Sequence, residues 1–440
     1  MAETALVVGM GSSGEAVARH LLDRGARVVA VDDAPTDAAR RRAADAGINL
    51  IVGPDLDVLR RLVTAAEVVV PSPGVPEGHP VFALAEELGT PVRGEVELAG
   101  RWARRPVVAI TGTNGKTTVT ELVTAMLQES GARAVAAGNI GLPLSEAVRR
   151  DVDVFVAEVS SFQLRFTDSF RPKVAVWLNL AEDHLDWHAD MAAYAAAKAR
   201  IWANQGPGDV AVVNADDPVV MVNAAHAPST VVTFGLSEPA DYTVVGDELR
   251  GPAGALATIA DLRRALPHDL ANGLAAAAAA LAAGATVEGV GAALRQREGG
   301  PHRVELVAES GGVRWYDDSK ATNPHAALAA LSGFESVVLI AGGRNKGLDL
   351  RPLASASDRV RGVVALGEAA PEVAAAFAGA RPVVSVAAMG EAVEAAAAMA
   401  QPGDVVLLAP ACASFDQYGS YAERGDDFAR RVRERLGASR

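Results

Sequence analysis

The chain of 440 residues is poor in several residue types, and each shortage excludes a class of protein. Its one cysteine, Cys412, excludes an internal disulfide framework and a metal site built from several cysteines. The longest apolar run, around 274–285, is well short of the roughly 20 residues that cross a bilayer. No basic segment followed by an apolar block opens the sequence, so we predict a soluble, cytoplasmic protein without a membrane partner.

Positive charges are outnumbered by negative ones, with 41 lysines and arginines against 54 aspartates and glutamates. The net charge of -13 argues against a nucleic-acid partner, because neutralising phosphates requires clustered lysine and arginine. Almost all the cations are arginines, and lysine occurs only at Lys116, Lys173, Lys198, Lys320 and Lys346. A lysine kept in such a chain suggests a position that needs a compact, titratable amine, although a solvated surface explains any single one.

What the sequence does contain is a repeated pattern of a short apolar run, a glycine or aspartate turn, and an alanine-rich amphipathic stretch. Continuous apolar strands separated by helices are typical of parallel sheets covered on both faces, so the predicted fold class is α/β. We expect strands at 5–8, 28–31, 68–70, 107–110, 154–157, 174–178, 210–213, 337–341, 362–366 and 405–409.

Two breaks divide this pattern into three blocks. The first block ends at the turn Arg93-Gly94-Glu95, and the second ends at Gly299-Gly300-Pro301. A chain of this length also favours more than one domain. We therefore expect domains at 1–96, 97–300 and 301–440.

The segment Gly9–Gly14 (Gly-Met-Gly-Ser-Ser-Gly) follows a predicted strand and opens a helix expected over 15–24. Backbone amides at a helix N-terminus suit a pyrophosphate group. Asp32 ends the next strand, where dinucleotide folds place a ribose-binding acid, and Ser72-Pro73-Gly74 would lie at the same sheet edge. A tight glycine turn without a ligand remains the alternative, because this pattern is common.

A second loop, Gly112–Thr118, lies between the strand 107–110 and a helix expected from Val119. Strand, Gly-Lys-Thr loop and helix form the phosphate cradle of a P-loop. Lys116 would reach the β- and γ-phosphates of ATP, and the Thr117 hydroxyl would bind Mg²⁺. The loop is shorter than the full pattern, since position 110 is isoleucine.

Candidate metal ligands follow two neighbouring strands. Glu158 comes directly after the strand 154–157, and Asp183 and His184 follow the strand 174–178. A capping carboxylate or a polar turn explains any one of them. Because the carboxyl ends of parallel strands share one sheet edge, their common position favours a metal–phosphate site.

Six segments together resemble the Mur ligase family, in order along essentially the whole chain: Gly112–Thr117, Gly138–Gly141, Glu158–Phe162, Glu182–His184, Asp317–Asn323 and Pro410–Asp416. The last two resemble the branch that adds D-glutamate to UDP-N-acetylmuramoyl-L-alanine. The resemblance implies three domains: a Rossmann-like N-terminal domain for the UDP precursor, a central P-loop-type ATPase, and a Rossmann-like C-terminal domain for the amino acid. It implies an ATP- and Mg²⁺-dependent ligase of peptidoglycan precursor synthesis, acting through an acyl phosphate.

The resemblance also implies roles for the residues at matching positions. Those for ATP are Gly112, Thr113, Asn114, Gly115, Lys116, Thr117, Thr118, Asn272, Arg303 and Asp318. Those for the UDP precursor are Ser12, Ser13, Gly14, Asp32, Ser72, Gly74, Asn139 and His184, and those for D-glutamate are Thr322, Lys346, Ser414 and Tyr421. The implied Mg²⁺ ligands are Thr117, Glu158, His184 and a carbamylated Lys198, and the implied catalytic group is Lys116, Lys198, His184 and Glu158.

The chain departs from the family pattern at three places. Asp33-Ala34 stands where the family commonly has Thr-Arg, Asp269 stands where an asparagine often follows a histidine, and Tyr421 replaces a phenylalanine. These departures leave the contacts to the nucleotide bases open. For Lys198 the sequence alone shows only a lysine on an alanine-rich helix, where solvation is the usual explanation.

Three alternatives remain open from the sequence. One is a ligase of the same superfamily with another amino acid, and a second is a non-catalytic nucleotide-binding protein. The third is a nicotinamide-dependent oxidoreductase built on Gly9–Gly14, which leaves Gly112–Thr118 unexplained. We expect a monomer, although no residue pattern fixes the oligomeric state.

Overall fold

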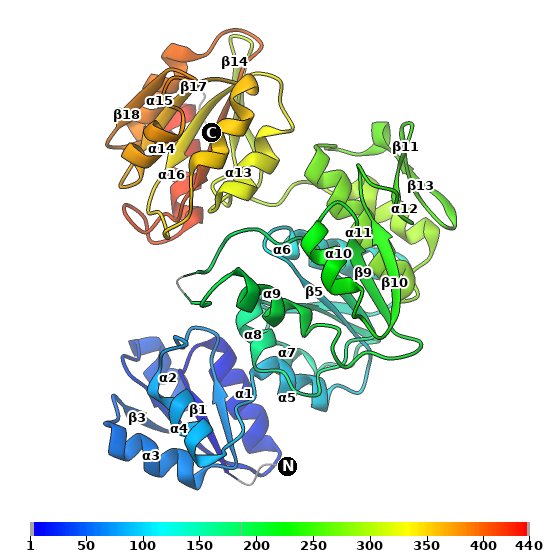
Figure 1. The fold of residues 1–440 in the computed structure, drawn as a ribbon, viewed down its shortest axis with the longest axis vertical. Helices are drawn as coiled ribbons and strands as arrows, with labels where there is room; N and C mark the ends of the chain where they lie inside the picture. The colour runs from blue at the N-terminus through cyan, green and yellow to red at the C-terminus, as the bar shows by residue number, and fades with distance from the viewer. Residues whose placement is uncertain (1–3, 186, 438–440) are drawn as a thin grey trace. The chain divides into compact units, whose positions relative to one another are not determined.

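The computed structural model describes residues 4–185 and 187–437 (Figure 1). These residues form two compact units. The first unit comprises 4–180, 187–259 and 272–295, and the second comprises 181–185, 260–271 and 296–437. Both units are built from sheets covered by helices, so the predicted α/β class is confirmed.

The first sheet of unit one has the strand order β3-β2-β1-β4, and every pairing among its described strands is parallel. Its strands are rich in valine and its central strands are buried, which is typical of a sheet covered on both faces. The elements are β1 (Thr4–Val8), α1 (Ser12–Asp23), β2 (Arg27–Asp32), α2 (Asp37–Asp45), β3 (Asn49–Val52), α3 (Leu56–Ala65), β4 (Val68–Pro71) and α4 (Pro80–Leu88).

The second sheet of unit one has the order β10-β9-β8-β5-β7-β6 in the described chain and is also parallel. Helix α5 (Glu95–Trp102) connects the two sheets along the chain. The elements are β5 (Val107–Thr111), α6 (Lys116–Glu129), β6 (Ala134–Gly138), α7 (Leu144–Ala147), β7 (Val154–Glu158), α8 (Ser161–Arg165), β8 (Val174–Trp177), α9 (Met191–Ala199), β9 (Val210–Asn214), α10 (Pro218–Ala224) and β10 (Thr230–Phe234).

A small antiparallel sheet in unit one was not predicted from the sequence. It has the order β11-β12-β13, and its strands are only three to five residues long, so they carry little periodic signal. Its elements and the helices that follow are β11 (Thr243–Val245), β12 (Glu248–Gly251), β13 (Gly254–Thr258), η1 (Ile259–Asp261), α11 (Pro267–Ala282) and α12 (Val287–Gln296).

The sheet of unit two has the order β14-β15-β19-β16-β17-β18 among the residues described. Only β14 runs antiparallel, and the other pairings are parallel. The elements are β14 (Glu305–Ser310), β15 (Val313–Asp317), α13 (Pro324–Leu331), β16 (Val337–Gly342), η2 (Arg351–Arg359), β17 (Val360–Leu366), α14 (Ala370–Ala376), β18 (Val383–Val386), α15 (Met389–Met399), β19 (Val405–Ala411) and α16 (Tyr421–Arg435).

All ten predicted strands lie in parallel strands of these sheets, with 174–178 one residue too long. The helix starts differ more. Helix α6 begins at Lys116 rather than Val119, because Gly115, with φ +85°, already turns the chain into the helix. Helix α1 begins at Ser12 rather than residue 15, directly after Gly11. Within the described chain, no helix combines the length and apolarity that crossing a membrane needs.

Candidate active site

The Gly112–Thr118 loop connects the fully buried strand β5 to α6, as the sequence predicts. Gly115 is the residue that this geometry requires. Its φ is +85°, and a Cβ atom there would lie 2.6 Å from Oδ1 of Asn272. Asn272, from α11, is therefore packed against the loop. Thr117 and Thr118 lie in the first turn of α6. Backbone N–H groups in a first turn have no hydrogen-bond partner within the helix and can bind an anion.

Asn179, just after β8, fixes the loop and was not predicted from the sequence. Its Oδ1 accepts the backbone N–H groups of Thr113 at 3.0 Å and of Asn114 at 2.9 Å. Its Nδ2 donates to the carbonyl of Asn114 at 3.2 Å. The loop therefore has its conformation set by a residue on the neighbouring strand, before any phosphate arrives.

Two of the predicted lysines meet at the loop. Nζ of Lys116 donates to the carbonyl oxygens of Gly112 at 2.9 Å and Thr113 at 3.0 Å. Nζ of Lys198, on α9, donates to the same Gly112 oxygen at 2.8 Å. The Lys198 side chain is buried, and its amine lies 4.5 Å from the ring centre of Tyr194. A lysine on such a helix is usually explained by exposure to solvent. Because Lys198 is buried, that explanation does not apply to it.

Glu158 is the centre of a compact oxygen-rich group. Its Oε2 accepts the Thr117 hydroxyl at 2.8 Å, and its Oε1 accepts Nδ2 of Asn139 at 2.9 Å. The Glu158 residue is buried, with 3% of its surface exposed. A carboxylate and a hydroxyl at the carboxyl end of parallel strands, beside a phosphate-binding loop, form a donor set that fits Mg²⁺.

A cavity of about 560 Å³ in unit one is lined by residues of both its large sheets. Six of the predicted precursor residues line it: Ser12, Ser13, Asp32, Ser72, Gly74 and Asn139. Gln163 of α8 and His79 also line it, and neither was predicted. A cavity of this size suits a ligand larger than a single amino acid.

The N-terminus of α1 opens onto this cavity. Its N-cap residue, Gly11, offers no side-chain cap, so the amides of Ser12 and Ser13 have no capping side chain. Gly14 does not line the cavity. A Cβ atom at Gly14 would stand 2.1 Å from the Gly9 carbonyl oxygen, so glycine here allows the helix to approach the strand.

Asp32 was predicted to contact a ribose, and its carboxylate also makes backbone hydrogen bonds. Its Oδ2 accepts the N–H of Met10 at 2.9 Å, and its Oδ1 accepts that of Ala34 at 3.1 Å. Ser72 similarly donates its hydroxyl to the Gly9 carbonyl at 2.7 Å. Both residues therefore shape the glycine turn in addition to lining the cavity.

In unit two, Lys346 is held by an acidic residue. Its Nζ lies 2.6 Å from Oδ1 of Asp183, and Nδ2 of Asn323 donates to Oδ2 of the same carboxylate at 3.0 Å. Burial alone would raise the pKa of Asp183, but the charges of His184 and Lys346 outweigh it and hold that pKa below its ordinary value. Asp183 therefore stays ionised and orients the Lys346 amine.

His184 lies beside Asp183 in unit two and adopts a positive φ of 57°. Its backbone N–H donates to Asp183 Oδ1 at 2.9 Å, and its Nε2 lies 3.8 Å from Oδ2. The structure therefore places His184 in this acidic turn. Its roles as a metal ligand and a precursor contact stay predictions.

Arg424 links the segments that carry the other predicted amino-acid residues, and it was not predicted. The guanidinium is buried and donates to the carbonyls of Ser319, Cys412 and Ala413, between 3.0 and 3.2 Å away. Those carbonyls flank Thr322 on one side and the buried Ser414 on the other. The ring of Tyr421 lies 3.9 Å from the Lys320 amine.

The predicted nucleotide residues Arg303 and Asp318 lie together in unit two. Oδ1 of Asp318 accepts the N–H of Val304 at 3.2 Å, and burial raises the pKa of Asp318 well above its ordinary value. Arg264 donates to the Val304 carbonyl at 3.0 Å and pairs with both carboxylate oxygens of Asp269 at 2.7 Å. Asp269, one of the departures from the family pattern, therefore has its own ion-pair partner in this chain.

Comparison with protein families decides the identity of the fold. The Mur ligase MurD-like N-terminal domain matches residues 3–94, the Mur ligase middle domain matches 110–280, and the Mur ligase glutamate ligase domain matches 302–412. The chain belongs to the Mur ligase family. The family predicted from the sequence is thereby confirmed.

Curated Mur ligases resemble the chain over nearly its full length. The UDP-N-acetylmuramoylalanine--D-glutamate ligase of Frankia casuarinae is 49% identical, over 98% of this chain and 94% of the relative. The protein of the same name from Pelotomaculum thermopropionicum is 44% identical, over 96% of each chain. Both relatives are therefore similar to this chain across the three matched domains.

Solved Mur ligase structures share the fold at low sequence identity. A pseudomurein peptide ligase type C from Methanothermus fervidus aligns with a TM-score of 0.64 and 19% identity, over 99% of this chain and all of that one. The UDP-N-acetylmuramate-alanine ligase of Thermotoga maritima aligns with a TM-score of 0.60 and 18% identity, over the whole of both chains. These similarities support the Mur ligase fold.

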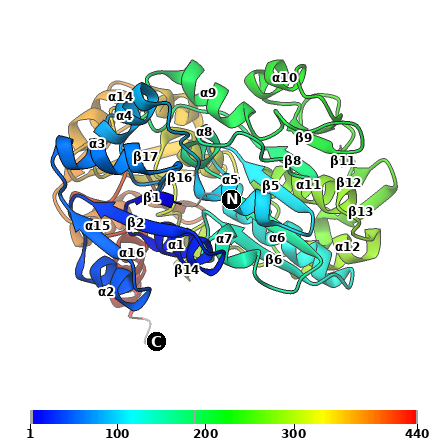
Figure 2. The same ribbon diagram turned by 90° about the horizontal axis from the view of Figure 1, so that it is seen from below.

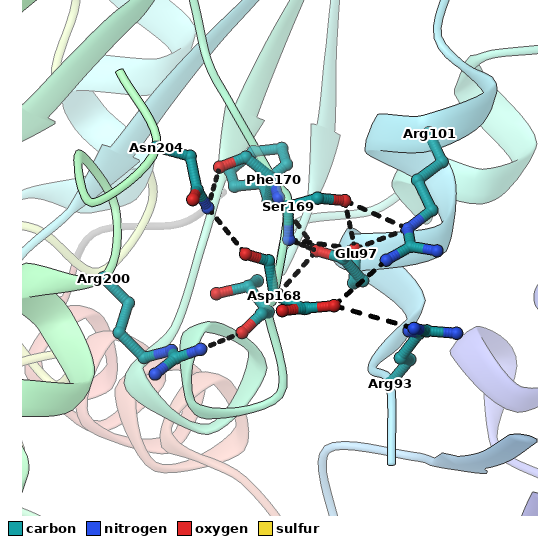
Figure 3. Close-up of polar contacts among 9 residues, drawn as sticks. Arg93, Glu97, Arg101, Asp168, Ser169, Phe170, Arg200 and Asn204 are labelled. Carbon is teal, nitrogen blue, oxygen red and sulfur yellow. Dashed lines mark hydrogen bonds and ion pairs between the residues drawn. The ribbon is translucent and has the colours of Figure 1, made fainter. Parts of the chain in front are cut away.

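One further network of the Mur ligase core connects α5 to the end of α9 (Figure 3). The buried carboxylate of Glu97 accepts the backbone N–H groups of Asp168, Ser169 and Phe170, between 2.8 and 3.1 Å. On the other side of this turn, Asn204 donates to the carbonyl oxygens of Asp168 and Phe170. The turn therefore joins α5 to the segment that follows the Lys198 helix.

Proposed function

We propose that this Mur ligase joins D-glutamate to the carboxylate of UDP-N-acetylmuramoyl-L-alanine, using Mg²⁺ and ATP, in peptidoglycan precursor synthesis. One observation carries the proposal. Glu158 bonds to Thr117 of the phosphate-binding loop through one oxygen and to Asn139, a residue of the cavity wall, through the other. The donor set for a metal–triphosphate group is thus joined to the wall of the cavity proposed for the precursor. The names of the similar relatives, UDP-N-acetylmuramoylalanine--D-glutamate ligases, support the choice of substrates.

In the proposed first step, an oxygen of the L-alanyl carboxylate attacks the γ-phosphorus of ATP. The bond from that phosphorus to ADP breaks, and an acyl phosphate forms. Lys116 beside the loop would offset the charge on the transferring phosphoryl group, and bound Mg²⁺ would supply further charge. We assign the metal to Thr117, Glu158, His184 and a carbamylated Lys198. The Gly112, Thr113, Asn114, Gly115 and Thr118 amides would hold the phosphates.

For the precursor, we propose that Ser12 and Ser13 offer their amides to the diphosphate at the start of α1. The positive end of a helix favours an anion there, and the first-turn amides have no capping side chain. Asp32, Ser72 and Gly74 would line the nucleoside side. Asn139 and His184 would hold the muramoyl-alanine end, next to the metal–phosphate group.

In the proposed second step, the D-glutamate amine attacks the acyl carbon, phosphate leaves, and the amine loses a proton. Thr322, Lys346, Ser414 and Tyr421 would surround the amino acid. Lys346 would pair with its side-chain carboxylate, which is supported by an amine already oriented by Asp183. Asn272, Arg303 and Asp318 would fix the nucleoside of ATP.

We also propose the domain boundaries 1–96, 97–300 and 301–440, and a monomer that acts in the cytoplasm. The three family matches, which end near 94 and begin again near 110 and 302, support these boundaries.

The test is phosphate release by the purified protein with Mg·ATP and UDP-N-acetylmuramoyl-L-alanine, with D-glutamate present or omitted. We expect sustained release only when all three substrates are present. Lys116→Ala should abolish it at saturating ATP, because the remaining loop lacks its cation for the transferring group. Lys173→Ala, an exposed lysine that pairs with Asp209, is the matched control and should be unaffected.

Near-normal turnover of Lys116→Ala would overturn the role of the loop. No release with any combination of substrates would overturn the ligase function. Release with another amino acid in place of D-glutamate would favour a different ligase of the superfamily, and binding of NAD(H) would favour the oxidoreductase alternative.

A further inference from the structure

Three helices of unit one meet around the backbone of a single residue, Ser145. Helices α1, α5 and α7 lie side by side (Figure 2). From α5, the carboxylate of Glu95 accepts the backbone N–H of Ser145 through Oε1. From α1, Nδ1 of His20 donates to the Ser145 carbonyl at 3.0 Å. Both backbone groups of one residue are thus held by side chains of other helices, far away in sequence.

Glu95 is costly to place here, which indicates a purpose beyond stability. It has 2% of its surface exposed, and its Oε2 has no hydrogen-bond partner among the described residues. Burial raises the pKa of Glu95, against the hydrogen bonds to Ser145. A carboxyl group moved from water into such a site costs free energy that an apolar side chain would avoid. The hydrogen bond from the Ser145 N–H to the Glu95 carboxylate fixes the position of that N–H group.

His20 is packed so that its ring cannot turn away. The residue is buried, and its ring stacks on Trp102 of α5 with the ring centres 4.1 Å apart and the planes 12° apart. The stack fixes the direction of Nδ1 toward the Ser145 carbonyl. Helices α1 and α5 therefore hold Ser145 between them as one assembly.

Ser145 is the second residue of α7, directly after a segment that lines the precursor cavity. Gly138, Asn139, Ile140, Gly141 and Pro143 of that segment are all part of the cavity wall. Glu95 accepts one of the N–H groups that the start of a helix leaves without a partner, where α7 has no side-chain cap of its own. The position of α7, and so of the end of the wall, depends on this bond.

The other end of the wall segment is fixed to the catalytic group. The N–H of Asn139 donates to the Glu158 carbonyl at 2.8 Å, and a Cβ at Gly138 would lie 2.2 Å from the same oxygen. Inside the segment, the Gly138 N–H donates to the Leu142 carbonyl at 2.8 Å. The wall is a short, closed loop with one end at Glu158 and the other at Ser145, so a shift at Ser145 moves the whole wall.

We propose that Glu95 and His20 are positioning residues for the precursor site. They set the place of Ser145, and through it the Gly138–Pro143 wall, without lining the cavity themselves. The substrate identity rests on the proposed function. The physical claim is that losing either contact weakens binding of the UDP-linked precursor and leaves the binding of ATP unchanged.

The experiment compares Glu95→Ala with Glu95→Gln. Glutamine keeps an acceptor oxygen for the Ser145 N–H at the same reach, whereas alanine removes it. We expect Glu95→Ala to raise the KM for UDP-N-acetylmuramoyl-L-alanine about tenfold, because a wall displaced by a fraction of an ångström misplaces the substrate. Glu95→Gln should stay within about threefold of wild type, and the KM for ATP should change less than about twofold in both.

Glu146→Ala is the matched control. It removes a carboxylate from the same short helix, next to Ser145, and no hydrogen bond of that side chain is described in the structure, so wild-type constants are expected. Should Glu95→Ala fail to fold, His20→Phe decides the question. Phenylalanine keeps the stack on Trp102 and loses only the bond to Ser145, and it too should raise the precursor KM without changing that of ATP.

The proposal is overturned if a folded Glu95→Ala or His20→Phe variant has a wild-type KM for the precursor, or if the KM values for precursor and ATP rise together. Calorimetric titration with the precursor alone gives a second readout that needs no turnover. If the wild-type protein binds the precursor but releases no phosphate, the proposed function fails, while the positioning role is still decided by the binding constants of the variants.

Discussion

The ion pair between Lys346 and Asp183 places a cation in the group proposed for D-glutamate. We expect Lys346→Ala to raise the KM for D-glutamate by at least about tenfold, because the side-chain carboxylate of the substrate loses its counter-charge. The KM for ATP should change less than about threefold. Steady-state kinetics with each substrate varied in turn measures both constants, and the opposite ranking would remove Lys346 from the amino-acid site.

Glu97 is the residue for which the structure predicts a pH-dependent stability. Burial alone would raise its pKa, but hydrogen bonds from the Asp168 backbone, the Ser169 hydroxyl and Arg101 outweigh burial and hold that pKa below its ordinary value. Because the folded-state pKa lies below that of the unfolded chain, ionised Glu97 stabilises the fold at neutral pH. This contribution is lost as the pH falls through the folded-state pKa.

Glu97→Gln should therefore lower the free energy of unfolding by about 3 kcal/mol at neutral pH, since its amide presents N–H groups to other N–H donors. Urea unfolding at a series of pH values measures the difference from wild type, which should be constant down to the ordinary glutamate pKa of about 4.3 and shrink below it. Glu288→Gln, at an exposed position on α12, is the control. A difference that stays constant at lower pH as well would contradict the role of the Glu97 charge.

At the scale of elements, Gly14 sets how closely α1 approaches β1. A Cβ at Gly14 would lie 2.1 Å from the Gly9 carbonyl oxygen and 2.7 Å from Ser72 Oγ, so α1 must move to accommodate it. We expect Gly14→Ala to cost about 3 kcal/mol of unfolding free energy and to weaken precursor binding, because the start of α1 shifts. Gly11→Ala is the control for stability, since nothing lies within 4 Å of a Cβ there and its φ is -69°.

Thermal unfolding and precursor titration of the two glycine variants make the comparison. Equal melting temperatures for Gly14→Ala and wild type would show that a Cβ atom at position 14 fits between α1 and β1 without loss of stability. The same elements illustrate where helix starts could not be predicted. Helix α6 begins three residues early because of the left-handed Gly115, a backbone state that no periodicity reveals.

At the scale of the whole molecule, the cavity proposed for the precursor lies in unit one, whereas Lys346 lies in unit two, which also contains His184 of the proposed precursor residues. Lys346→Ala, in unit two, should therefore leave the dissociation constant of the precursor within about twofold of wild type in the absence of ATP. Calorimetric titration checks this. A tenfold loss of precursor affinity would show that the precursor also depends on the Lys346 group.

Much of the fold and part of the site could be predicted because their signals are local. Ten strands were placed from continuous apolar runs, and the Gly112–Thr118 loop from its strand, its lysine and its helix. The residues that hold these parts in place gave no such signal. Asn179, Glu95 and Arg424 act on backbone groups brought close only by the pairing of strands and the packing of helices.

The sequence by itself determined the α/β class, the phosphate-binding loop and the family, because periodicity and short motifs depend on neighbouring residues. Only the tertiary structure decided that Lys116 and Lys198 share the Gly112 carbonyl, that Asp183 orients Lys346, and that Glu95 and His20 hold Ser145. Each of these contacts joins residues of different elements. The strength of a hydrogen bond depends on distance and direction in space, and a linear order of residues specifies neither.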